Sequence, residues 1–481
     1  MPVPPSASSA FSPSSGASAR APHLAAPDPA LIERFDVAGP RYTSYPTADR
    51  FVEAFGAQEY GRWLEHRAQF PVPTPLSVYV HIPFCQSVCW YCACNKIGTR
   101  DRSRGDVYVD DLLRELALYT DRIGTGQPVS QMHWGGGTPT FLLPQALERL
   151  MQGIERAVRF TPQAERSIEV DPRSVDAVDL QRLRALGFNR LSFGVQDFDP
   201  TVQQAVHRVQ STEQVFELTH AARTLAFESV NVDLIHGLPH QTPERFAQTL
   251  DTVAALRPDR IAVYGYAHLP QRFKPQRRIH EGDLPSAGDK LAMMRLAIER
   301  LGAQGYVHIG LDHFALPDDA LAVAQRMGVL HRNFMGYTTQ PDCDMIGLGV
   351  SAIGRIGPSY GQNARMLETW QASVRSGVLP IERGCELSRD DMLRRFVIMS
   401  MMCNGTIPFA AVERDYLVSA QQVFRDELER LREFEALGLV RIDAEGVTAT
   451  PLGRFFVRPI AMLFDRALRS ALPRGQYSRV L

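Results

Sequence analysis

The chain lacks several features that would assign it to a class at once. Its net charge is only −1, from 52 basic and 53 acidic residues, so no broad electrostatic field would attract nucleic acid or an anionic membrane. No uninterrupted apolar run approaches the ~20 residues that a membrane-spanning helix needs. We therefore expect a soluble protein with no nucleic-acid partner and no membrane span.

The first thirty residues lack the apolar core of a secretory signal and are rich in Pro, Ser and Ala. A transit peptide would carry more basic residues than Arg20 alone. We expect residues 1–35 to form a disordered tail and the protein to be cytoplasmic.

The seven cysteines are an odd number, which is poor material for a disulfide framework. Three of them are scattered, as Cys343, Cys385 and Cys403. The other four fall within the stretch HIPFCQSVCWYCAC, as Cys85, Cys89, Cys92 and Cys94. In a reducing compartment, clustered cysteines indicate a metal site or redox chemistry.

The C-x3-C-x2-C spacing of the first three cysteines favours an iron–sulfur cluster. Structural zinc usually takes two separated pairs of ligands, and this sequence has no second CxxC pair. A disulfide here would close a very small loop, and iron–sulfur clusters are held by closely spaced cysteines. Three thiolates for four irons would leave one iron open to a substrate or cofactor.

From about residue 76 to 355, short apolar runs alternate with amphipathic stretches that have helical periodicity. The predicted strands are 76–82, 130–136, 166–172, 190–196, 229–239 and 260–270, with a possible edge strand at 307–314. The predicted helices are 104–122, 144–160, 176–186, 212–225, 243–256 and 287–301. Six such repeats imply parallel strands, closed as a barrel or left open, with functional residues at the carboxyl ends of the strands.

Unusual residues follow these predicted strands. The cysteines come after the first, GGGTPT ends the second, and Glu169 closes the third. GGGTPT lacks the Lys of a phosphate-binding loop, so a nucleoside triphosphate is not indicated. Glycines at a strand end instead allow the backbone-like amino acid group of a ligand to approach closely.

Beyond about residue 360 the pattern changes to a helical region of winged-helix type. Ser388 with Asp391 is a plausible helix cap, and a helix, a short hairpin and a further strand or helix follow. Many acidic residues make a lid or packing role a better interpretation than DNA binding.

Eight motifs together resemble the oxygen-independent coproporphyrinogen III oxidases of the radical S-adenosylmethionine (SAM) superfamily. The motifs are RYTSYPTADRF, YVHIPFCQSVCWYCACNKI, HWGGGTPT, SIEVDPR, LSFGVQDF, DLIHGLP, YAHLP and LHRNFMGYTTQ. The resemblance runs from about residue 36 to the C-terminus. It implies an α/β fold, a partial (β/α)6 radical SAM barrel with an N-terminal arm and a C-terminal mostly helical domain. We place the arm, over the active site, at 36–75, the barrel at 76–355 and the helical domain at 356–481.

The resemblance also implies the reaction and its cofactors. A [4Fe-4S] cluster would bind SAM and, with one electron, produce a 5′-deoxyadenosyl radical that takes hydrogen from a substrate propionate. Loss of CO2 and an electron would leave a vinyl group. Done twice on coproporphyrinogen III, this gives protoporphyrinogen IX for heme biosynthesis. The electron donor and acceptor stay unidentified, and we expect a monomer.

The matching motifs carry the expected site residues. The implied cluster ligands are Cys85, Cys89 and Cys92. The residues that would hold two SAM molecules are Tyr79, Tyr91, Gly136, Gly137, Thr138, Glu169, Gln196, Arg208, Asp233, Ala267 and Ile353. Cys94, also matched in the family, is interpreted as a non-ligand with a role in activity, or alternatively as a small buried residue.

The stretch RYTSYPT offers what a tetracarboxylate macrocycle needs, a cation beside aromatic rings. Arg41 would bind a substrate carboxylate and Tyr42 would form part of an aromatic wall. The alternative is a tyrosine-rich strap that packs against the barrel.

Two other functions compete with the oxidase. A heme chaperone of the same family would lack a cysteine at position 94 and the GPRYTSYPT arm, and both are present here. A radical SAM methyltransferase would also suit two bound SAM molecules, but motif agreement along the chain favours the oxidase.

Overall fold

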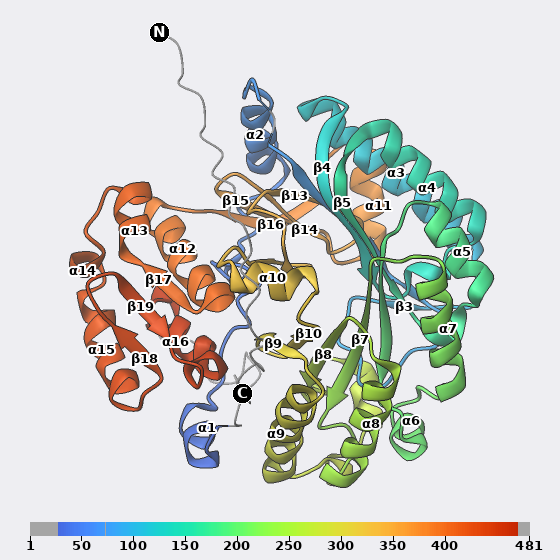
Figure 1. Ribbon diagram of the computed structural model, residues 1–481. Helices are drawn as coiled ribbons and strands as arrows, with labels where there is room; N and C mark the ends of the chain where they lie inside the picture. Colours follow the sequence, from blue (N-terminus) through green and yellow to red (C-terminus); the bar gives the residue numbers. More distant parts are fainter. Residues whose placement is uncertain (1–26, 73, 470–481) are drawn as a thin grey trace, which may run out of the picture.

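Six parallel strands form the centre of one large sheet in the computed structural model, which describes residues 27–72 and 74–469 (Figure 1). Each strand pairs in parallel with the next in chain order. They are β1 (Leu76–Ile82), β4 (Gln127–Gly136), β5 (Val158–Val170), β6 (Arg190–Gln196), β7 (Ser229–His236) and β8 (Arg260–Gly265). All six predicted strands are confirmed, and β1 and β6 match at both ends.

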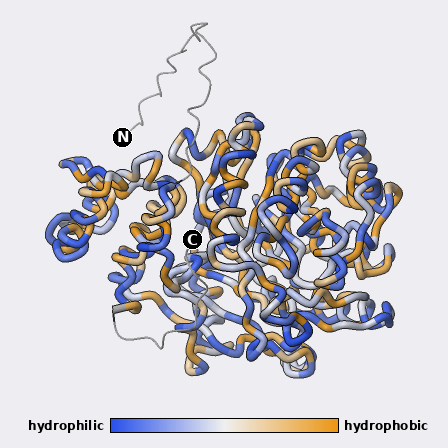
Figure 2. Tube along the Cα trace, turned by 90° about the horizontal axis from the view of Figure 1, so that it is seen from below, coloured by the Kyte–Doolittle hydropathy of each residue, from blue (hydrophilic) through white to orange (hydrophobic). Residues whose placement is uncertain are grey.

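The predicted helices connect these strands and cover the outer face of the sheet (Figure 1). They are α3 (Ser103–Ile123), α4 (Pro144–Ala157), α5 (Ala177–Ala185), α7 (Thr212–Thr224), α8 (Pro243–Leu256) and α9 (Ala287–Ala303). In α4 the buried side chains Leu147, Leu150 and Ile154 recur at three to four residues, which turns one face of the helix to the sheet. Figure 2 shows hydrophobic and hydrophilic positions alternating along such helices.

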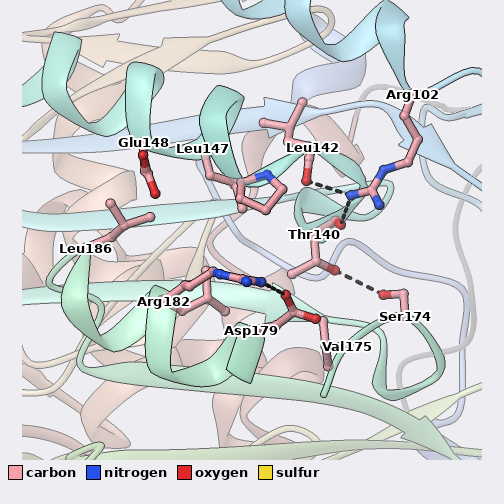
Figure 3. Close-up of a pocket in the computed structure, with 12 residues that line it drawn as sticks. Arg102, Thr140, Leu142, Leu147, Glu148, Ser174, Val175, Asp179, Arg182 and Leu186 are labelled. Atoms are coloured by element: carbon pink, nitrogen blue, oxygen red, sulfur yellow. Dashed lines mark hydrogen bonds and ion pairs between the residues drawn. The ribbon is translucent and has the colours of Figure 1, made fainter. Parts of the chain in front are cut away.

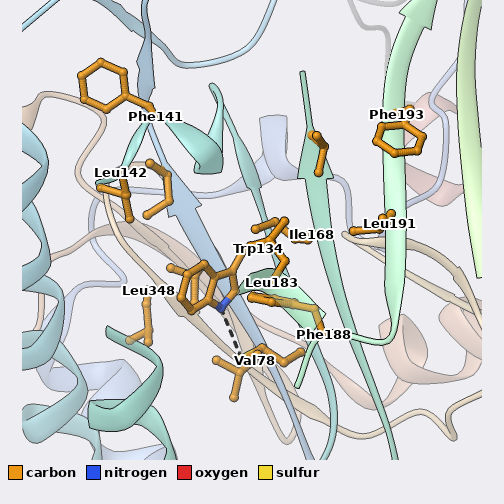
Figure 4. Close-up of a cluster of buried hydrophobic side chains, with 14 of the residues drawn as sticks. Val78, Trp134, Phe141, Leu142, Ile168, Leu183, Phe188, Leu191, Phe193 and Leu348 are labelled. Carbon is orange, nitrogen blue, oxygen red and sulfur yellow. Dashed lines mark hydrogen bonds between the residues drawn. The ribbon is translucent and has the colours of Figure 1, made fainter. Parts of the chain in front are cut away.

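The core between sheet and helices centres on Trp134, which has no exposed surface (Figure 4). Its ring meets Phe188 edge to face at a centroid distance of 5.1 Å, and its indole N–H donates to the Met132 Sδ at 3.2 Å. Val78, from β1, and Ile168, from β5, lie on either side in the same cluster. This packing fixes the relative positions of β1, β4 and β5, the strands that carry the cysteines and the glycine run.

The sheet continues beyond the predicted barrel on both edges, to twelve strands in all among the described residues. On one edge β13 (Asp344–Leu348) runs parallel to β1, followed by antiparallel β14 (Ile353–Ile356), β15 (Ser359–Asn363) and β16 (Ile381–Glu386). On the other edge lie β10 (His313–Ala315) and β9 (Val307–Gly310). The boundary that we placed between 355 and 356 therefore cuts through this sheet, and the helical region starts only after residue 386. The sequence placed the boundary wrongly because the pairing of distant strands by hydrogen bonds leaves no local pattern.

The C-terminal region is mostly helical and has a small sheet, β17-β19-β18, which agrees with the winged-helix prediction. Its helices are α12 (Arg389–Asn404), α13 (Phe409–Tyr416), α14 (Ala420–Val423), α15 (Arg425–Ala436), η6 (Gly453–Phe456), α16 (Val457–Met462) and α17 (Arg466–Arg469). Its strands are β17 (Thr406–Pro408), β18 (Val440–Ile442) and β19 (Gly446–Ala449). Ser388 caps α12 with Asp391 as predicted.

Residues 29–35, which we expected in a disordered tail, form helix α1 (Pro29–Phe35) instead. Ile32 and Phe35 are buried in the core of the C-terminal region, and the Phe35 ring lies 4.7 Å from that of Phe434. This burial offsets the entropy of ordering the segment. The rest of the expected tail, residues 1–26, lies outside the described residues.

Shorter elements complete the chain. They are η1 (Ala48–Arg50), α2 (Ala57–Ala68), β2 (Phe84–Cys85), β3 (Ile97–Gly98), η2 (Pro139–Phe141), η3 (Pro172–Ser174), α6 (Pro200–Ala205), η4 (Lys274–Arg278), η5 (Glu281–Asp283), α10 (Ala320–Arg326), β11 (His331–Asn333), β12 (Gly336–Thr338) and α11 (Leu367–Arg375). Within the described ranges, no helix combines the length and the apolar character needed to cross a bilayer.

A buried carboxylate, Glu115 on α3, ties the outer helix layer to the extended edge of the sheet. It accepts hydrogen bonds from the Gly349 backbone N–H at 2.7 Å, the Asn363 Nδ2 at 2.6 Å and the Trp370 Nε1 at 3.1 Å. Burial raises the pKa of Glu115 to about 8, although these three donors oppose the rise. The group thus holds the turn after β13 in place.

Replacing Glu115 with Ala should destabilise the fold. Three buried donors would lose their acceptor, and each orphaned group costs about 1–3 kcal/mol. We expect the free energy of unfolding, measured by urea titration, to fall by about 3 kcal/mol or more. The control is Glu429→Ala, an exposed position on α15, which should change stability little. Equal stability of the two variants would contradict the role given to Glu115.

Candidate active site

Most of the predicted functional side chains gather at the carboxyl ends of the parallel strands. The cysteine loop follows β1, the glycine run ends β4, and Glu169 and Gln196 lie at the ends of β5 and β6. The register sets Glu169 beside Ser192 and Gly194 beside Asp233 on neighbouring strands. Because parallel strands end on one edge, these groups share one rim of the sheet.

The cysteine loop leaves the rim and returns to it through a small parallel pair, β2 with β3. The Cys85 carbonyl accepts from the Thr99 N–H at 2.9 Å, which closes the loop. Cys85 and Cys89 are buried, Cys92 is half-buried and Cys94 is exposed. The Thr138 hydroxyl donates to the Cys85 Sγ at 3.5 Å, so the loop touches the end of the glycine run.

The environments of the thiols differ. Burial raises the pKa of Cys85 to about 11. A hydrogen bond from the Cys94 thiol, together with nearby Lys96, lowers the pKa of Cys92 to about 6 despite burial. Cys94 thus supports a thiolate on Cys92, its neighbour two positions before it.

Two arginines face the Cys89 sulfur. The Arg208 Nη1 lies 3.3 Å and the Arg173 Nη2 3.5 Å from the Sγ. Both guanidinium groups also bind Asp171, at 3.2 Å from Arg208 and 2.6 Å from Arg173. Burial would raise the pKa of Asp171, but the two arginines hold it below its usual value. Two guanidinium groups and one carboxylate leave a net positive charge beside the Cys89 sulfur.

The glycine run has no room for side chains. A Cβ on Gly136, whose φ is +114°, would lie 2.6 Å from the His81 ring, and one on Gly137 would lie 2.7 Å from the Pro83 carbonyl carbon. The Gly137 N–H donates to the Ile82 carbonyl at 2.8 Å. The run therefore packs directly on the chain that leads into the cysteine loop, and its backbone lines the rim.

Glu169 lies against this run. Its carboxylate accepts from the Gly136 N–H at 3.1 Å and faces the His133 Nε2 at 3.4 Å. Burial would raise the pKa of Glu169, but His133 and the Gly136 N–H hold it below its usual value. Tyr79 stacks on His133 at a centroid distance of 6.0 Å and pairs through its hydroxyl with the His81 Nδ1 at 2.9 Å. An ionised carboxylate beside aromatic rings is suited to a cationic ligand group.

Asp233 is a second carboxylate of the rim, and it is half-buried. It accepts from the Ser192 hydroxyl at 3.0 Å and from the Asn231 Nδ2 at 2.8 Å. Burial, reinforced by the charge of Glu169, raises the pKa of Asp233 to about 6. Its protonation state therefore changes near neutral pH.

The remaining predicted cofactor residues lie in different places around the rim. Gln276 brings Tyr91 and Ala267 together, because its Nε2 donates to both backbone carbonyls, at 2.9 and 3.2 Å. Gln196 ends β6 with a φ of +71°, a strained value for a residue with a side chain. Ile353 stands apart at the start of β14, where it packs against the cluster that contains Phe51.

Arg41 lies at the rim, beside the ends of the last strands. It forms an ion pair with Asp312 at 2.7 Å, and its guanidinium carbon lies 5.6 Å from the Tyr264 ring centroid. The side chain keeps 36% exposure, so part of it faces solvent. This placement agrees with a residue of the arm near the site.

Tyr42 lies elsewhere than we expected. It has no exposed surface, belongs to the core of the C-terminal region, and donates its hydroxyl hydrogen to Asp465 at 2.9 Å. A side chain so enclosed offers no wall to a substrate, and this corrects the expectation. The alternative is right that this tyrosine packs, but the ring lies in the C-terminal core and not against the barrel, since an apolar ring gains more from this core than from the rim.

Sequence reasoning missed several polar neighbours of the site. Arg173 at Cys89, His133 at Glu169 and Asn231 at Asp233 were not singled out. A signal existed: His133 stands two residues before Gly135 on β4, and Asn231 two before Asp233 on β7, so the period of two puts each on the same face of its strand.

The chemistry of the thiols fits a multi-iron cluster. Among the described residues, no group of three or more His, Cys, Asp or Glu side chains is close enough to hold one metal ion. A cluster of four irons separates its ligands more widely than one ion does. Cys85, Cys89 and Cys92 are unbridged thiols on one closed loop. They lie close enough that the charges of Cys92 and Cys89 contribute to the raised pKa of Cys85. Thiolates are the ligands that such clusters take.

A hollow of about 210 Å³ lies outside this rim, between α4 and α5 (Figure 3). Its polar side chains other than Glu148 already have partners. Arg102 donates to the Leu142 carbonyl at 2.8 Å, Thr140 pairs with Ser174 at 3.1 Å, and Arg182 binds Asp179 at 2.9 Å. It does not compete with the rim as the candidate active site.

Comparison with known proteins agrees with this geometry. The Radical SAM superfamily model matches residues 79–253, and the HemN C-terminal domain model matches residues 387–456. The oxygen-independent coproporphyrinogen III oxidases of Pseudomonas aeruginosa and Escherichia coli are each 48% identical, over 94% of this chain and 98% of theirs. The solved structure described as coproporphyrinogen III oxidase (HemN) from Escherichia coli, a radical SAM enzyme, has a TM-score of 0.87 at 47% identity, covering 92% of this chain and 99% of its own.

The parallel α/β sheet with a three-cysteine loop after its first strand is that of a radical SAM protein. The match extends through the C-terminal region, at high identity over nearly the whole length of the relatives. The chain belongs to the family of oxygen-independent coproporphyrinogen III oxidases.

Replacing Tyr42 with Phe tests its structural role. The variant loses the hydrogen bond to buried Asp465, and we expect unfolding to become easier by about 1–2 kcal/mol. SAM affinity should stay at the wild-type value. Urea unfolding and equilibrium SAM binding measure the two quantities.

The matched control is Tyr416→Phe, which removes an exposed hydrogen bond to the Met392 carbonyl and should cost less. A Tyr42→Phe protein of unchanged stability that has lost substrate turnover would return Tyr42 to the active site.

Proposed function

We propose that this protein converts coproporphyrinogen III to protoporphyrinogen IX without O2, by oxidative decarboxylation of two propionate side chains to vinyl groups in heme biosynthesis. The observation that carries the proposal is the rim itself, a closed three-thiol loop packed on a side-chain-free glycine run. The full-length relatives carry the name of this activity.

A [4Fe-4S] cluster and two SAM molecules are the cofactors, and together they supply a radical able to remove hydrogen from an unactivated carbon. Cys85, Cys89 and Cys92 would hold the cluster. Arg208 and Arg173 would offset the negative charge that thiolate ligands bring to the Cys89 side. Buried charge is tolerated when it is paired in this way.

The glycine run would receive the amino acid part of SAM. Gly136 and Gly137 carry no side chain that would keep a ligand from their backbone, Thr138 stands beside Cys85, and the Glu169 carboxylate would bind an ammonium group. The other expected cofactor contacts are Tyr79, Tyr91, Gln196, Arg208, Asp233, Ala267 and Ile353.

Arg41 is proposed to bind a carboxylate of the substrate. Its partly exposed guanidinium next to Tyr264 supports this, and binding would exchange part of the Asp312 contact for a substrate carboxylate. Cys94, exposed and next to the cluster ligands, is proposed to serve activity without binding iron. We further propose that the enzyme is a monomer. We also propose that it is cytoplasmic, since a reducing compartment keeps its seven thiols free.

Single Cys→Ser replacements test the cluster assignment. Ser at position 85, 89 or 92 should abolish iron–sulfur absorbance and SAM cleavage after anaerobic reconstitution, because a hydroxyl is a poor substitute for a soft thiolate. Ser at position 94 should leave iron content near wild type while turnover falls.

The matched controls are the three cysteines outside the loop, at positions 343, 385 and 403, whose Ser variants should keep iron and activity. Full iron content in Cys89→Ser, or iron loss in Cys94→Ser equal to that of Cys89→Ser, would refute the assigned ligand set.

The raised pKa of Asp233 predicts a pH dependence of SAM affinity. Its pKa lies at about 6, so the carboxylate that would bind a ribose hydroxyl or ammonium is lost as the pH falls through that value. SAM binding, measured by equilibrium dialysis, should weaken on this acid side. Asp233→Asn should bind weakly at every pH and lack the step.

The exposed Asp318→Asn variant serves as the control and should retain the wild-type profile. An unchanged acid limb in Asp233→Asn would assign the titration to another group.

A further inference from the structure

The face of the molecule next to the cysteine loop carries a concentration of positive charge that the proposed reaction does not use. The chain as a whole has a net charge of −1, yet Arg272, Lys274, Arg277 and Arg278 lie within one short segment. No Asp or Glu occurs between Asp259 and Glu281. All four cationic residues are exposed.

This segment is fastened to the cysteine loop. Gln276 is only 1% exposed, and its side-chain amide donates to the Tyr91 carbonyl at 2.9 Å. It also accepts from the Leu269 N–H at 2.6 Å, which fixes the turn. The cations on η4 therefore stand at a fixed position beside the residues that flank Cys92.

Next to the charged segment, aromatic side chains cover the outside of the cysteine loop. The Arg278 guanidinium carbon lies 5.7 Å from the centroid of Trp90, the residue that follows Cys89. The exposed His207 ring stacks on Trp90 at 5.5 Å, and Val209 beyond it is 61% exposed. We call the surface of Trp90, His207, Val209, Arg272, Lys274, Arg277 and Arg278 the basic face.

None of Lys274, Arg277 and Arg278 takes part in an ion pair within the described portion of the chain. The Arg277 Nε donates to the Pro270 carbonyl at 3.0 Å, which leaves the remaining nitrogens of its fork toward solvent. Their charge is thus available to a partner. Clustered cations with a nearby Trp are the composition of a charge-steered protein interface.

We propose that the basic face is the docking site of an acidic one-electron carrier protein that reduces the cluster. The proposal rests on the proposed function, which requires an electron from outside the chain. The carrier loses one electron and is oxidised, the cluster gains that electron and is reduced, and no atom is transferred. Redox encounters of this kind use small, electrostatically guided interfaces that release quickly.

The carboxylates of the substrate are a less suitable occupant. A tetracarboxylate macrocycle needs cations that converge on a cavity. The four cations here are exposed along one turn and its flanks, whereas Arg41 lies at the rim with part of its side chain exposed.

The test compares two charge reversals in the reconstituted holoenzyme. Lys274→Glu/Arg277→Glu alters the basic face and leaves Trp90 and Gln276 untouched. The matched control, Arg425→Glu/Arg430→Glu, reverses two exposed arginines on α15. Iron and sulfide content is measured first in both.

The probe is an acidic plant-type [2Fe–2S] ferredoxin, and its binding is measured by calorimetry at low and at physiological ionic strength. We expect salt-sensitive binding that the basic-face variant weakens by about tenfold or more and the control leaves unchanged. SAM cleavage driven by the reduced ferredoxin should fall in the same proportion. Cleavage driven by dithionite, which needs no docking, should remain at the wild-type rate.

Absence of salt-sensitive binding, or equal weakening in both variants, would overturn the proposal. So would a raised KM for coproporphyrinogen III in the basic-face variant with dithionite as reductant, because that result would assign the face to the substrate. Failure of the wild-type holoenzyme to cleave SAM with dithionite would instead refute the proposed function. Binding is measured without turnover, so it judges the docking site independently.

Discussion

The close approach of the glycine run to the end of β1 is the constraint on which the active site depends. Gly137 donates to the Ile82 carbonyl at 2.8 Å, and a Cβ at Gly136 or Gly137 would overlap His81 or Pro83. Only bare backbone lets β4 end so near the start of the cysteine loop. The cysteine loop and the Glu169 carboxylate consequently both lie against the glycine run, the loop through Thr138 and Cys85 and the carboxylate through the Gly136 N–H.

Paired charge is the second property of this rim. Asp171 shares two arginines with the Cys89 sulfur, and Asp312 has Arg41. Each of these groups is costly to bury alone and tolerable in its pair. The pairs set the charges along the rim, so that two cations lie beside the Cys89 sulfur and the Glu169 carboxylate lies against the glycine run.

The N-terminal segment joins the two halves of the molecule. Tyr42 binds Asp465, and the Arg458 guanidinium donates to the Gly39 carbonyl at 2.7 Å and the Pro40 carbonyl at 3.1 Å. The neighbouring Arg41 turns the other way, to Asp312 at the sheet. The segment is therefore anchored in the C-terminal region through Pro40 and Tyr42, and Arg41 between them reaches the rim. This arrangement keeps Arg41 in position without a rigid element of its own.

The sequence by itself determined the repeating part of the protein. Period-two and helical hydrophobic patterns located six strands and their helices, because burial on one face leaves its mark residue by residue. Cysteine spacing and family motifs gave the cofactors, and the ends of the strands indicated where function lies. What only the tertiary structure decided are contacts between distant segments. The sheet runs on to Glu386 because β14, β15 and β16 pair with each other and β13. Tyr42 enters a core formed more than three hundred residues later in the chain, and Arg173 meets Cys89 across a loop. Such contacts depend on complementary surfaces that come together only on folding, and neither periodicity nor local composition records them.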